Sequence, residues 1–171
     1  MRNIVLIGFM GTGKTVIAKM LAHELDGKYV STDDLIEKKE KRNINDIFRD
    51  SGETYFRKIE KEIIKEISSQ KGQVIDAGGG AVLNGENMEN LSANGSIICL
   101  WSEPEIIYDR VKSTGHRPLL NVEDPLKKIK ELLDYRRPFY EKADIHIDTT
   151  NGNIKEAVDK IKEILNAEKD V

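Results

Sequence analysis

The sequence of 171 residues predicts one domain of the α/β class, a three-layer α/β/α fold built on a five-stranded parallel sheet. Two observations lead to this prediction. Five short apolar segments alternate with longer segments of helical period, an alternation typical of parallel strands joined by right-handed helical crossovers. The length suffices for one sizeable core and is short for two domains, and no repeat, low-complexity tract or linker divides residues 1–171.

The predicted strands are apolar segments, which cover residues 3–8, 28–31, 73–77, 96–101 and 143–148. Between them, apolar side chains recur every three or four residues, as on one face of a helix. Examples are Ile17, Leu21 and Leu25; Tyr55, Ile59, Ile63 and Ile67; and Ile154, Val158, Ile161 and Leu165. One long segment, STGHRPLLNVEDP at about residues 113–125, follows neither pattern. Loops of this length inside a compact domain are usually functional, so we predict a lid there.

Charge and composition exclude several classes of partner. The chain has 27 Lys and Arg against 30 Asp and Glu, so it lacks the basic excess of a nonspecific nucleic-acid-binding protein. No segment approaches the length of a transmembrane helix, and the apolar run at the N-terminus fits a first strand better than a signal peptide. The single cysteine, Cys99, lies in the apolar run SIICLW. We therefore expect a buried thiol, no membrane association and a reducing, cytoplasmic location.

Residues 8–15, GFMGTGKT, match the phosphate-binding pattern G-x-x-x-x-G-K-[ST] and lie between a predicted strand and a predicted helix, as that motif requires. The glycines would let backbone N–H groups point at phosphate oxygens, and the helix N-terminus favours the same anion. Lys14 would reach the β- and γ-phosphates, and Thr15 would place its hydroxyl on Mg²⁺. The alternative is a glycine-rich turn without a ligand, which the full match in its required context disfavours.

A phosphate-binding loop (P-loop) indicates a nucleotide but not a reaction, because ATPases, GTPases and small-molecule kinases share it. The N-K-x-D segment typical of GTPases is absent from the sequence. The length does not fit the core of a large oligomeric ATPase. A small phosphotransferase fits better, and an enzyme of this class needs a second pocket for the phosphoryl acceptor.

Three arginines are candidates for that second pocket. Arg57 lies in a helical segment one position away from its apolar stripe, and Glu60 is placed one turn later to form an ion pair with it. Arg136 takes a core-facing position in the helical segment 126–140, which is costly unless the guanidinium meets an anion. Arg117 lies in the predicted lid. The alternative for each alone is a solvated surface arginine, but the three placements together favour an anionic acceptor.

Three consecutive glycines, Gly78, Gly79 and Gly80, follow the predicted strand 73–77. They would bring bare backbone against a ligand at the carboxyl end of the sheet, where open α/β sheets bind their substrates. The alternative is a flexible turn, and the position directly after a strand favours the ligand site.

These motifs together resemble the shikimate kinases, which belong to the nucleoside-monophosphate-kinase-like P-loop proteins. The resemblance covers almost the whole chain and rests on GFMGTGKT, TDDLIE, NDIF, GETYFRKIE, GGGAV, RPLL, RRPFY and the strand ending in IDTT. It implies a fold of the P-loop kinase type. It also implies transfer of the γ-phosphoryl group of ATP to the 3-hydroxyl of shikimate, a step in chorismate and aromatic amino-acid biosynthesis. The partners implied are ATP, shikimate and one Mg²⁺ per subunit, and the family is commonly monomeric.

The resemblance also assigns roles to residues. Asp33 would bind the acceptor hydroxyls and act as the base, in substrate-binding helices at about residues 33–61. Arg57 and Arg136 would bind the shikimate carboxylate by planar, bidentate contacts, and the backbone of Gly78, Gly79 and Gly80 would complete the site. The implied catalytic residues are Asp33, Lys14 and Arg117, the last of which would reach the phosphates with the lid. The implied ATP site comprises Gly11, Thr12, Gly13, Lys14, Thr15, Val16, Arg110 and Arg117, with Arg110 near the adenine in a segment that matches the family only loosely.

The segment YVSTDDLIE departs from the family pattern, which usually has D-x-D at its centre. Aligned on TDDLIE, Asp33 is the second aspartate of that pattern, and Ser31 replaces the first, which would reach the Mg²⁺ shell through water. Asp34 is then a first-turn residue, favourable at a helix N-terminus. The alternative is that both aspartates only cap the helix.

The serine at position 31 leaves the magnesium site without its usual carboxylate. Asp76 stands at the end of the predicted strand 73–77, where many P-loop enzymes carry the acidic Walker-B residue. One hypothesis is that Asp76 contacts Mg²⁺ through water in place of residue 31, with Thr15 as the other protein group. The alternative is that Thr15, the phosphates and water suffice, since Mg²⁺ often keeps several waters.

Two other functions are possible, and particular residues disfavour each of them. Another small-metabolite kinase of the same fold, such as a gluconate or nucleotide kinase, would share the P-loop but would not need Arg57 and Arg136 beside the glycines. A nucleotide-binding module without catalysis is supported only by Ser31, and the presence of Asp33 and Lys14 speaks against it.

Overall fold

The computed structural model describes residues 2–113 and 118–167 and contains a five-stranded sheet. The strands are β1 (Asn3–Gly8), β2 (Lys28–Ser31), β3 (Gln73–Asp76), β4 (Gly95–Trp101) and β5 (Ile145–Asp148). Their spatial order is β2-β3-β1-β4-β5, and every neighbouring pair is parallel. The predicted parallel sheet of five strands is therefore confirmed.

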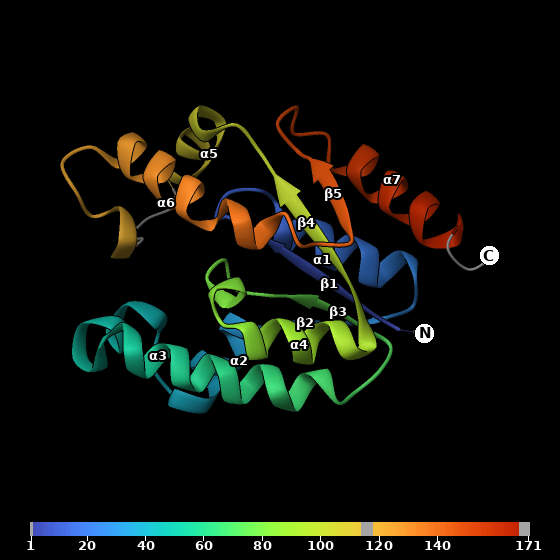
Figure 1. The fold of residues 1–171 in the computed structure, drawn as a ribbon, viewed down its shortest axis with the longest axis horizontal. Coiled ribbons are helices and arrows are strands. Elements are labelled where there is room, and N and C mark those ends of the chain that lie inside the picture. Colours follow the sequence, from blue (N-terminus) through green and yellow to red (C-terminus); the bar gives the residue numbers. More distant parts are fainter. Residues whose placement is uncertain (1, 114–117, 168–171) are drawn as a thin grey trace.

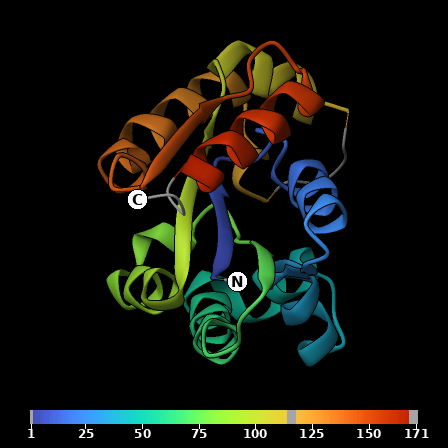
Figure 2. The ribbon, with the colours of Figure 1, turned by 90° about the vertical axis from the view of Figure 1, so that its right-hand side faces the viewer.

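Helices connect the strands and cover both faces of the sheet (Figures 1 and 2). They are α1 (Lys14–Glu24), α2 (Thr32–Glu40), α3 (Ile44–Ser68), α4 (Gly85–Asn94), α5 (Pro104–Val111), α6 (Pro125–Tyr140) and α7 (Ile154–Ala167). Two short 3-10 helices, η1 (Ala81–Leu83) and η2 (Pro118–Leu120), lie between them. Residues 114–117 of the predicted lid lie outside the described residues, whereas η2 lies within the lid after them and α6 begins at Pro125, where the predicted lid ends.

Two apolar clusters on opposite faces of the sheet produce the three layers. On one face, Ile4 and Leu6 of β1 pack with residues of α1 and α7. On the other face, Val5 and Ile7 pack with residues of α3 and α4 and with Tyr140 at the end of α6. All four β1 side chains are at most 4% exposed, which explains why this strand is an uninterrupted apolar run rather than an alternating one.

The carboxyl ends of three strands bring the predicted site residues to one edge of the sheet. The P-loop follows β1, the segment that begins α2 follows β2, and the three glycines follow β3. β3 lies between β2 and β1, and Ser31 is the direct partner of Asp76 in the register of β2 and β3. Open α/β sheets bind ligands at such an edge, so the topology itself assembles the candidate site.

Helix α3 is bent at Gly52, whose φ of 81° and ψ of 171° are not helical. Positive φ is readily adopted only by glycine, and here it allows two helical segments to join at an angle. The rings of Phe48 and Phe56, on either side of the bend, come within 4.8 Å of each other between centroids. The bend thus places two aromatic side chains against the pocket described below.

Within residues 2–113 and 118–167, no helix is both long enough and apolar enough to cross a membrane.

The thiol of Cys99 provides a test of this core. Cys99 is 2% exposed in β4, and burial raises the pKa of its thiol to about 12. At pH 8 almost no thiolate is present, so we expect no reaction of the native protein with Ellman's reagent, and reaction of one thiol after unfolding in guanidinium. Free glutathione under the same conditions controls for the reagent. Rapid stoichiometric labelling of the native protein would contradict this burial of β4.

Candidate active site

The P-loop is shaped by glycines that side chains could not replace. Gly8 has a φ of +139°, and a Cβ there would lie 2.3 Å from the carbonyl oxygen of Leu100. Gly13, with a φ of 92°, precedes the first residue of α1 and has no side chain that could cap the helix. Gly13 therefore provides no side-chain cap for the N-terminus of α1, and a helix N-terminus of this kind favours a bound anion such as phosphate.

The two side chains predicted to contact phosphate and metal extend from the first turn of α1. The Nζ of Lys14 donates hydrogen bonds to the carbonyl oxygens of Gly8, at 2.9 Å, and Phe9, at 3.0 Å, and so lies across the loop. The Oγ1 of Thr15 donates to the Oδ2 of Asp76 at 2.6 Å. The structure thus brings Thr15 together with the carboxylate that the sequence suggested for the metal site.

Residues distant in sequence hold the P-loop in position. Arg110, on α5, donates through Nη1 to the carbonyl oxygen of Gly11 at 3.0 Å and through Nη2 to that of Thr149 at 2.7 Å. The hydroxyl of Thr149 donates to the carbonyl oxygen of Thr12 at 2.8 Å. Arg110 therefore connects the P-loop to the segment after β5, while its predicted place beside an adenine stays a prediction. Val16, also predicted to contact ATP, is 55% exposed in the first turn of α1.

A cavity of about 280 Å³ lies beside the P-loop. Six residues predicted for the acceptor site line it: Asp33, Arg57, Gly78, Gly79, Gly80 and Arg136. The structure therefore gathers these residues around one space, drawn from α2, α3, the segment after β3, and α6. Arg117 was also predicted to act here, but it lies outside the described residues.

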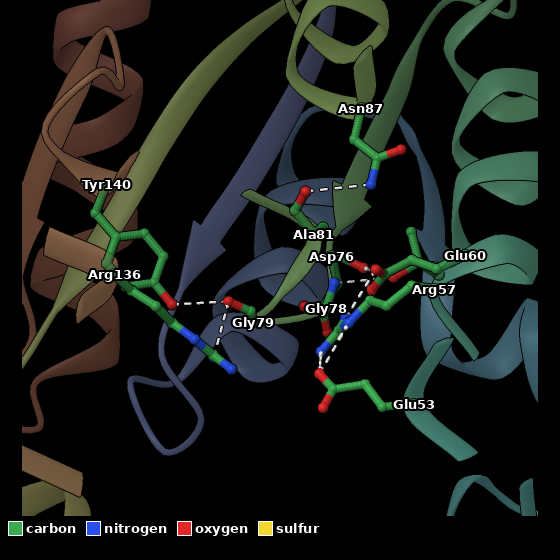
Figure 3. A network of polar contacts seen from close by, with 11 residues as sticks. Glu53, Arg57, Glu60, Asp76, Gly78, Gly79, Ala81, Asn87, Arg136 and Tyr140 are labelled. Carbon is green, nitrogen blue, oxygen red and sulfur yellow. Dashed lines mark hydrogen bonds and ion pairs between the residues drawn. The ribbon is translucent and has the colours of Figure 1, made fainter. Parts of the chain in front are cut away.

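Arg136 is buried, 3% exposed, as its core-facing position on α6 predicted. Its Nη1 donates to the carbonyl oxygen of Gly79 at 3.1 Å, and its guanidinium lies over the ring of Phe9, 5.4 Å from the centroid. The hydroxyl of Tyr140, one turn later, donates to the same carbonyl at 2.8 Å (Figure 3). The Nε of Arg136 has no hydrogen-bond partner among the described residues. Such a cation needs further acceptors, and a bound anion at the cavity would supply them.

Arg57 is held by an ion pair that the sequence predicted. Its Nη1 donates to the Oε2 of Glu60 at 2.8 Å, and it also pairs with the more exposed Glu53 (Figure 3). A Cβ at Gly80 would lie 2.3 Å from the Nη2 of Arg57, so only glycine lets the guanidinium reach this place. The glycine segment and the ion pair together direct Arg57 to the cavity.

Glu60 is the more deeply buried partner, 1% exposed. Burial raises the pKa of its carboxyl group above the ordinary value of 4.5, and the charge of Arg57 offsets part of that rise. The Oε1 of Glu60 has no hydrogen-bond partner among the described residues. A Cβ at Gly78 would lie 2.9 Å from this oxygen and 3.0 Å from the Oδ1 of Asp33, so both carboxylates adjoin Gly78.

The helix that carries Asp33 is capped by the preceding serine. The hydroxyl of Ser31 accepts a hydrogen bond from the backbone N–H of Asp34 at 3.1 Å, and Ser31 is the N-cap of α2. Asp34 is exposed in the first turn, whereas Asp33 lies half-buried at the cavity. The two adjacent aspartates therefore differ as expected, although the cap hydrogen bond is made by the serine.

Several residues of this site were not singled out from the sequence. Phe9 lies under Arg136, and the hydroxyl of Thr32 accepts from the backbone N–H of Gly78 at 2.9 Å. Other cavity residues are Met10, Glu37, Asn43, Ile44, Asn45, Phe48, Phe56 and Leu119. Most of these residues lie inside segments that carry the family resemblance, such as GFMGTGKT, TDDLIE and NDIF, and that membership is the sequence signal that could have indicated them.

The model of the family described as shikimate kinase matches residues 10–166 of the chain. A shikimate kinase of Thermodesulfovibrio yellowstonii is 50% identical over 161 residues, which cover 94% of this chain and 93% of that protein. One of Caldanaerobacter subterraneus is 47% identical over 94% of each chain. The chain belongs to the shikimate kinase family. It is therefore a kinase, and the expected P-loop kinase fold is confirmed.

Solved structures of the family share the architecture. The shikimate kinase from Acinetobacter baumannii in complex with shikimate has a TM-score of 0.95 at 35% identity, over 99% of this chain and 95% of that one. The shikimate kinase from Aquifex aeolicus has a TM-score of 0.84 at 34% identity, over 98% of both chains. Membership of the shikimate kinase family thus rests on sequence and on structure.

The buried carboxyl of Glu60 gives a pH-dependent prediction. A group whose pKa is raised by folding binds more protons in the native state, so its contribution to stability falls as the pH rises above its ordinary pKa. We expect the unfolding free energy of the wild type, relative to Glu60→Gln, to decline from below pH 4.5 towards neutrality. Denaturant melts of both proteins across this range measure it. A relative gain with rising pH would show that the ion pair with Arg57 outweighs the burial.

Proposed function

We propose that the protein transfers the γ-phosphoryl group of ATP to the 3-hydroxyl of shikimate, giving shikimate 3-phosphate and ADP in chorismate and aromatic amino-acid biosynthesis. One observation carries the proposal: beside the P-loop, two arginines and three carboxylates, those of Asp33, Glu37 and Glu60, line a single cavity. This set suits a small acceptor that has both an acid group and hydroxyl groups. The family membership and the likeness to the A. baumannii kinase in complex with shikimate support the same acceptor.

The acceptor carboxylate would be bound by Arg57 and Arg136. A guanidinium presents a planar pair of donors that matches a carboxylate, and both groups lie at the cavity with their orientation fixed by protein contacts. The carboxylate of Asp33, on the first turn of α2, would accept from the acceptor hydroxyls. The glycine backbone at residues 78–80 leaves room for the ring between these groups.

In the reaction, the 3-hydroxyl oxygen forms a bond to the γ-phosphorus while the bond from that phosphorus to the bridging oxygen of ADP breaks. Asp33 would orient the hydroxyl and accept its proton late, and the proton then passes to solvent. An aspartate is a weak base, so positioning is the larger part of this role. Lys14 and Arg117 would neutralise the charge that spreads over the transferred oxygens.

The residues at the P-loop fit a magnesium ion, one per subunit. The hydroxyl of Thr15 and the carboxylate of Asp76 are hard oxygen donors that already lie in contact. Mg²⁺ prefers such donors, and when bound with ATP it would neutralise phosphate charge.

We further propose that the protein works as a monomer in the cytoplasm, where Cys99 would stay reduced.

The acceptor and the role of Asp33 can be tested together. We expect release of ADP from Mg²⁺ and ATP to depend on shikimate, and Asp33→Asn to lower kcat by about 100-fold or more, because the hydroxyl loses both its orienting partner and its base. Asp34→Asn is the matched control, since it removes the neighbouring, exposed carboxylate. Turnover unaffected by shikimate, or an active Asp33→Asn variant, would refute the proposal.

Recognition of the acid group predicts a selective defect in Arg136→Met. A hydrogen bond to a charged group contributes about 1.5–3 kcal/mol, so we expect the KM for shikimate to rise about 10- to 100-fold. The KM for methyl shikimate, which lacks the charge, should change little. Arg137→Met is the control, because the side chain of Arg137 is 61% exposed on the same helix. Equal losses with both acceptors would contradict carboxylate recognition by Arg136.

A further inference from the structure

Residues 31 and 76 occupy equivalent places at the carboxyl edge of the sheet. In the parallel register, Ser31 at the end of β2 is the direct partner of Asp76 at the end of β3. Asp76 is in turn the partner of Leu6 on β1, two residues before the P-loop begins. Neighbouring strands are roughly 4.8 Å apart. A carboxylate at either end position could therefore approach the same region below the P-loop.

Ser31 has no carboxylate to offer a metal, and its hydroxyl already has a structural role. Its hydroxyl caps α2 by accepting from the N–H of Asp34, and the side chain is too short to extend farther. Of the two aspartates that follow, Asp33 lies at the acceptor cavity and Asp34 is exposed. The hydrogen bond of Ser31 joins it to Asp34 and not to Thr15, the P-loop hydroxyl that would bind the ion.

Asp76 does make that contact, and its carboxylate forms no ion pair with another described residue. Its Oδ2 accepts from the Oγ1 of Thr15 at 2.6 Å, and the residue is 7% exposed. Among residues 2–113 and 118–167, no basic side chain forms an ion pair with Asp76. A carboxylate this deeply buried is costly without a compensating charge. A metal ion bound beside Thr15 would provide this charge.

We propose that Asp76, at the end of β3, is the acidic residue that orients the water shell of Mg²⁺, and that a carboxylate at the partner position 31, at the end of β2, could take the same role. The proposal rests on the proposed use of Mg²⁺ with the nucleotide, but not on the identity of the acceptor. Mg²⁺ keeps several waters and takes few protein ligands, so one hydroxyl and one water-mediated carboxylate are sufficient.

The competing explanation is that Asp76 only positions the side chain of Thr15. Both explanations predict a loss of activity when Asp76 is changed, so activity does not separate them. They differ in the linkage between metal and nucleotide. If Asp76 orients the shell of the ion, its charge strengthens ADP binding only when Mg²⁺ is present, whereas a purely structural role affects ADP binding equally with and without the ion.

The experiment measures the Kd of ADP by calorimetry with and without Mg²⁺, in the absence of shikimate. The quantity of interest is the Kd of ADP without Mg²⁺ divided by the Kd with Mg²⁺, called the ratio below, which measures how much the ion strengthens binding. Asp76→Asn keeps the shape of the side chain and an oxygen that can accept from Thr15, but removes the charge. Loss of an outer-shell carboxylate typically costs about 10- to 100-fold in metal affinity, so we expect the ratio to fall by about this factor. The Kd without Mg²⁺ should not rise, because removal of a negative charge near the phosphates also removes a repulsion. An unchanged ratio, or equal weakening with and without Mg²⁺, would overturn the proposal.

Position 31 supplies the complementary test. In Asp76→Asn, the additional change Ser31→Asp should restore a large part of the ratio, because it returns a carboxylate to the partner position on β2. Ser31→Asp alone, with Asp76 present, should leave the ratio nearly unchanged, since the role is already filled. A rise of tenfold or more in the ratio in Ser31→Asp alone would overturn the proposal, and this test holds even if Asp76→Asn failed to fold. Loss in Asp76→Asn without rescue would refute the equivalence of the two positions.

These measurements separate the inference from the proposed function. The binding of ADP and Mg²⁺ is measured without an acceptor, so the ratio can be determined even if shikimate is not phosphorylated. A dependence of the ratio on Asp76 without shikimate-dependent turnover would support the metal role and refute only the acceptor. Shikimate-dependent turnover with a ratio that does not depend on Asp76 would support the acceptor and refute the metal role.

Discussion

The cavity beside the P-loop depends on two guanidinium groups, that of Arg136 buried and that of Arg57 partly exposed, each held in a fixed orientation. Arg136 is 3% exposed and is held by the carbonyl of Gly79 and the ring of Phe9, while Arg57 is held by Glu60. Each arrangement leaves some hydrogen-bonding capacity unused within the described residues, at the Nε of Arg136 and the Oε1 of Glu60. Burying such groups costs free energy that an acid-bearing, hydroxylated ligand would recover on binding. The other features of the site, including the three glycines, serve this arrangement by making room for it.

Much of this architecture could be predicted from the sequence, because the relevant patterns are local. All five strands are found, since parallel strands buried on both faces are short apolar runs with clear boundaries. The core-facing position of Arg136 and the i,i+3 pair of Arg57 with Glu60 follow from helical spacing alone. The P-loop could be placed because its pattern of glycines, lysine and threonine reflects one particular backbone shape.

Other features depend on contacts between distant segments and leave no local pattern. The bend at Gly52 was not predicted, because a single glycine within a helical pattern is also tolerated in straight helices. The position of Phe9 under Arg136 joins residues 127 positions apart, which helical or strand periodicity cannot reveal. The Asp76 carboxylate could be suspected from the strand end it occupies, but its contact with Thr15 required the register of three strands.

The hydrogen bonds from Thr149 and Arg110 to the P-loop have a consequence for when the loop takes its shape during synthesis of the chain. The loop lies near the N-terminus, yet the hydroxyl of Thr149 reaches the carbonyl of Thr12 across 137 residues, and Arg110 reaches Gly11 across 99. Contacts of such long range form late, because the cost of closing the intervening chain must be met first. A chain emerging from the ribosome therefore presents its nucleotide motif first and completes it last. A nascent chain that ends before β5 has the whole motif and Arg110, but it lacks Thr149, which bonds to both the loop and Arg110.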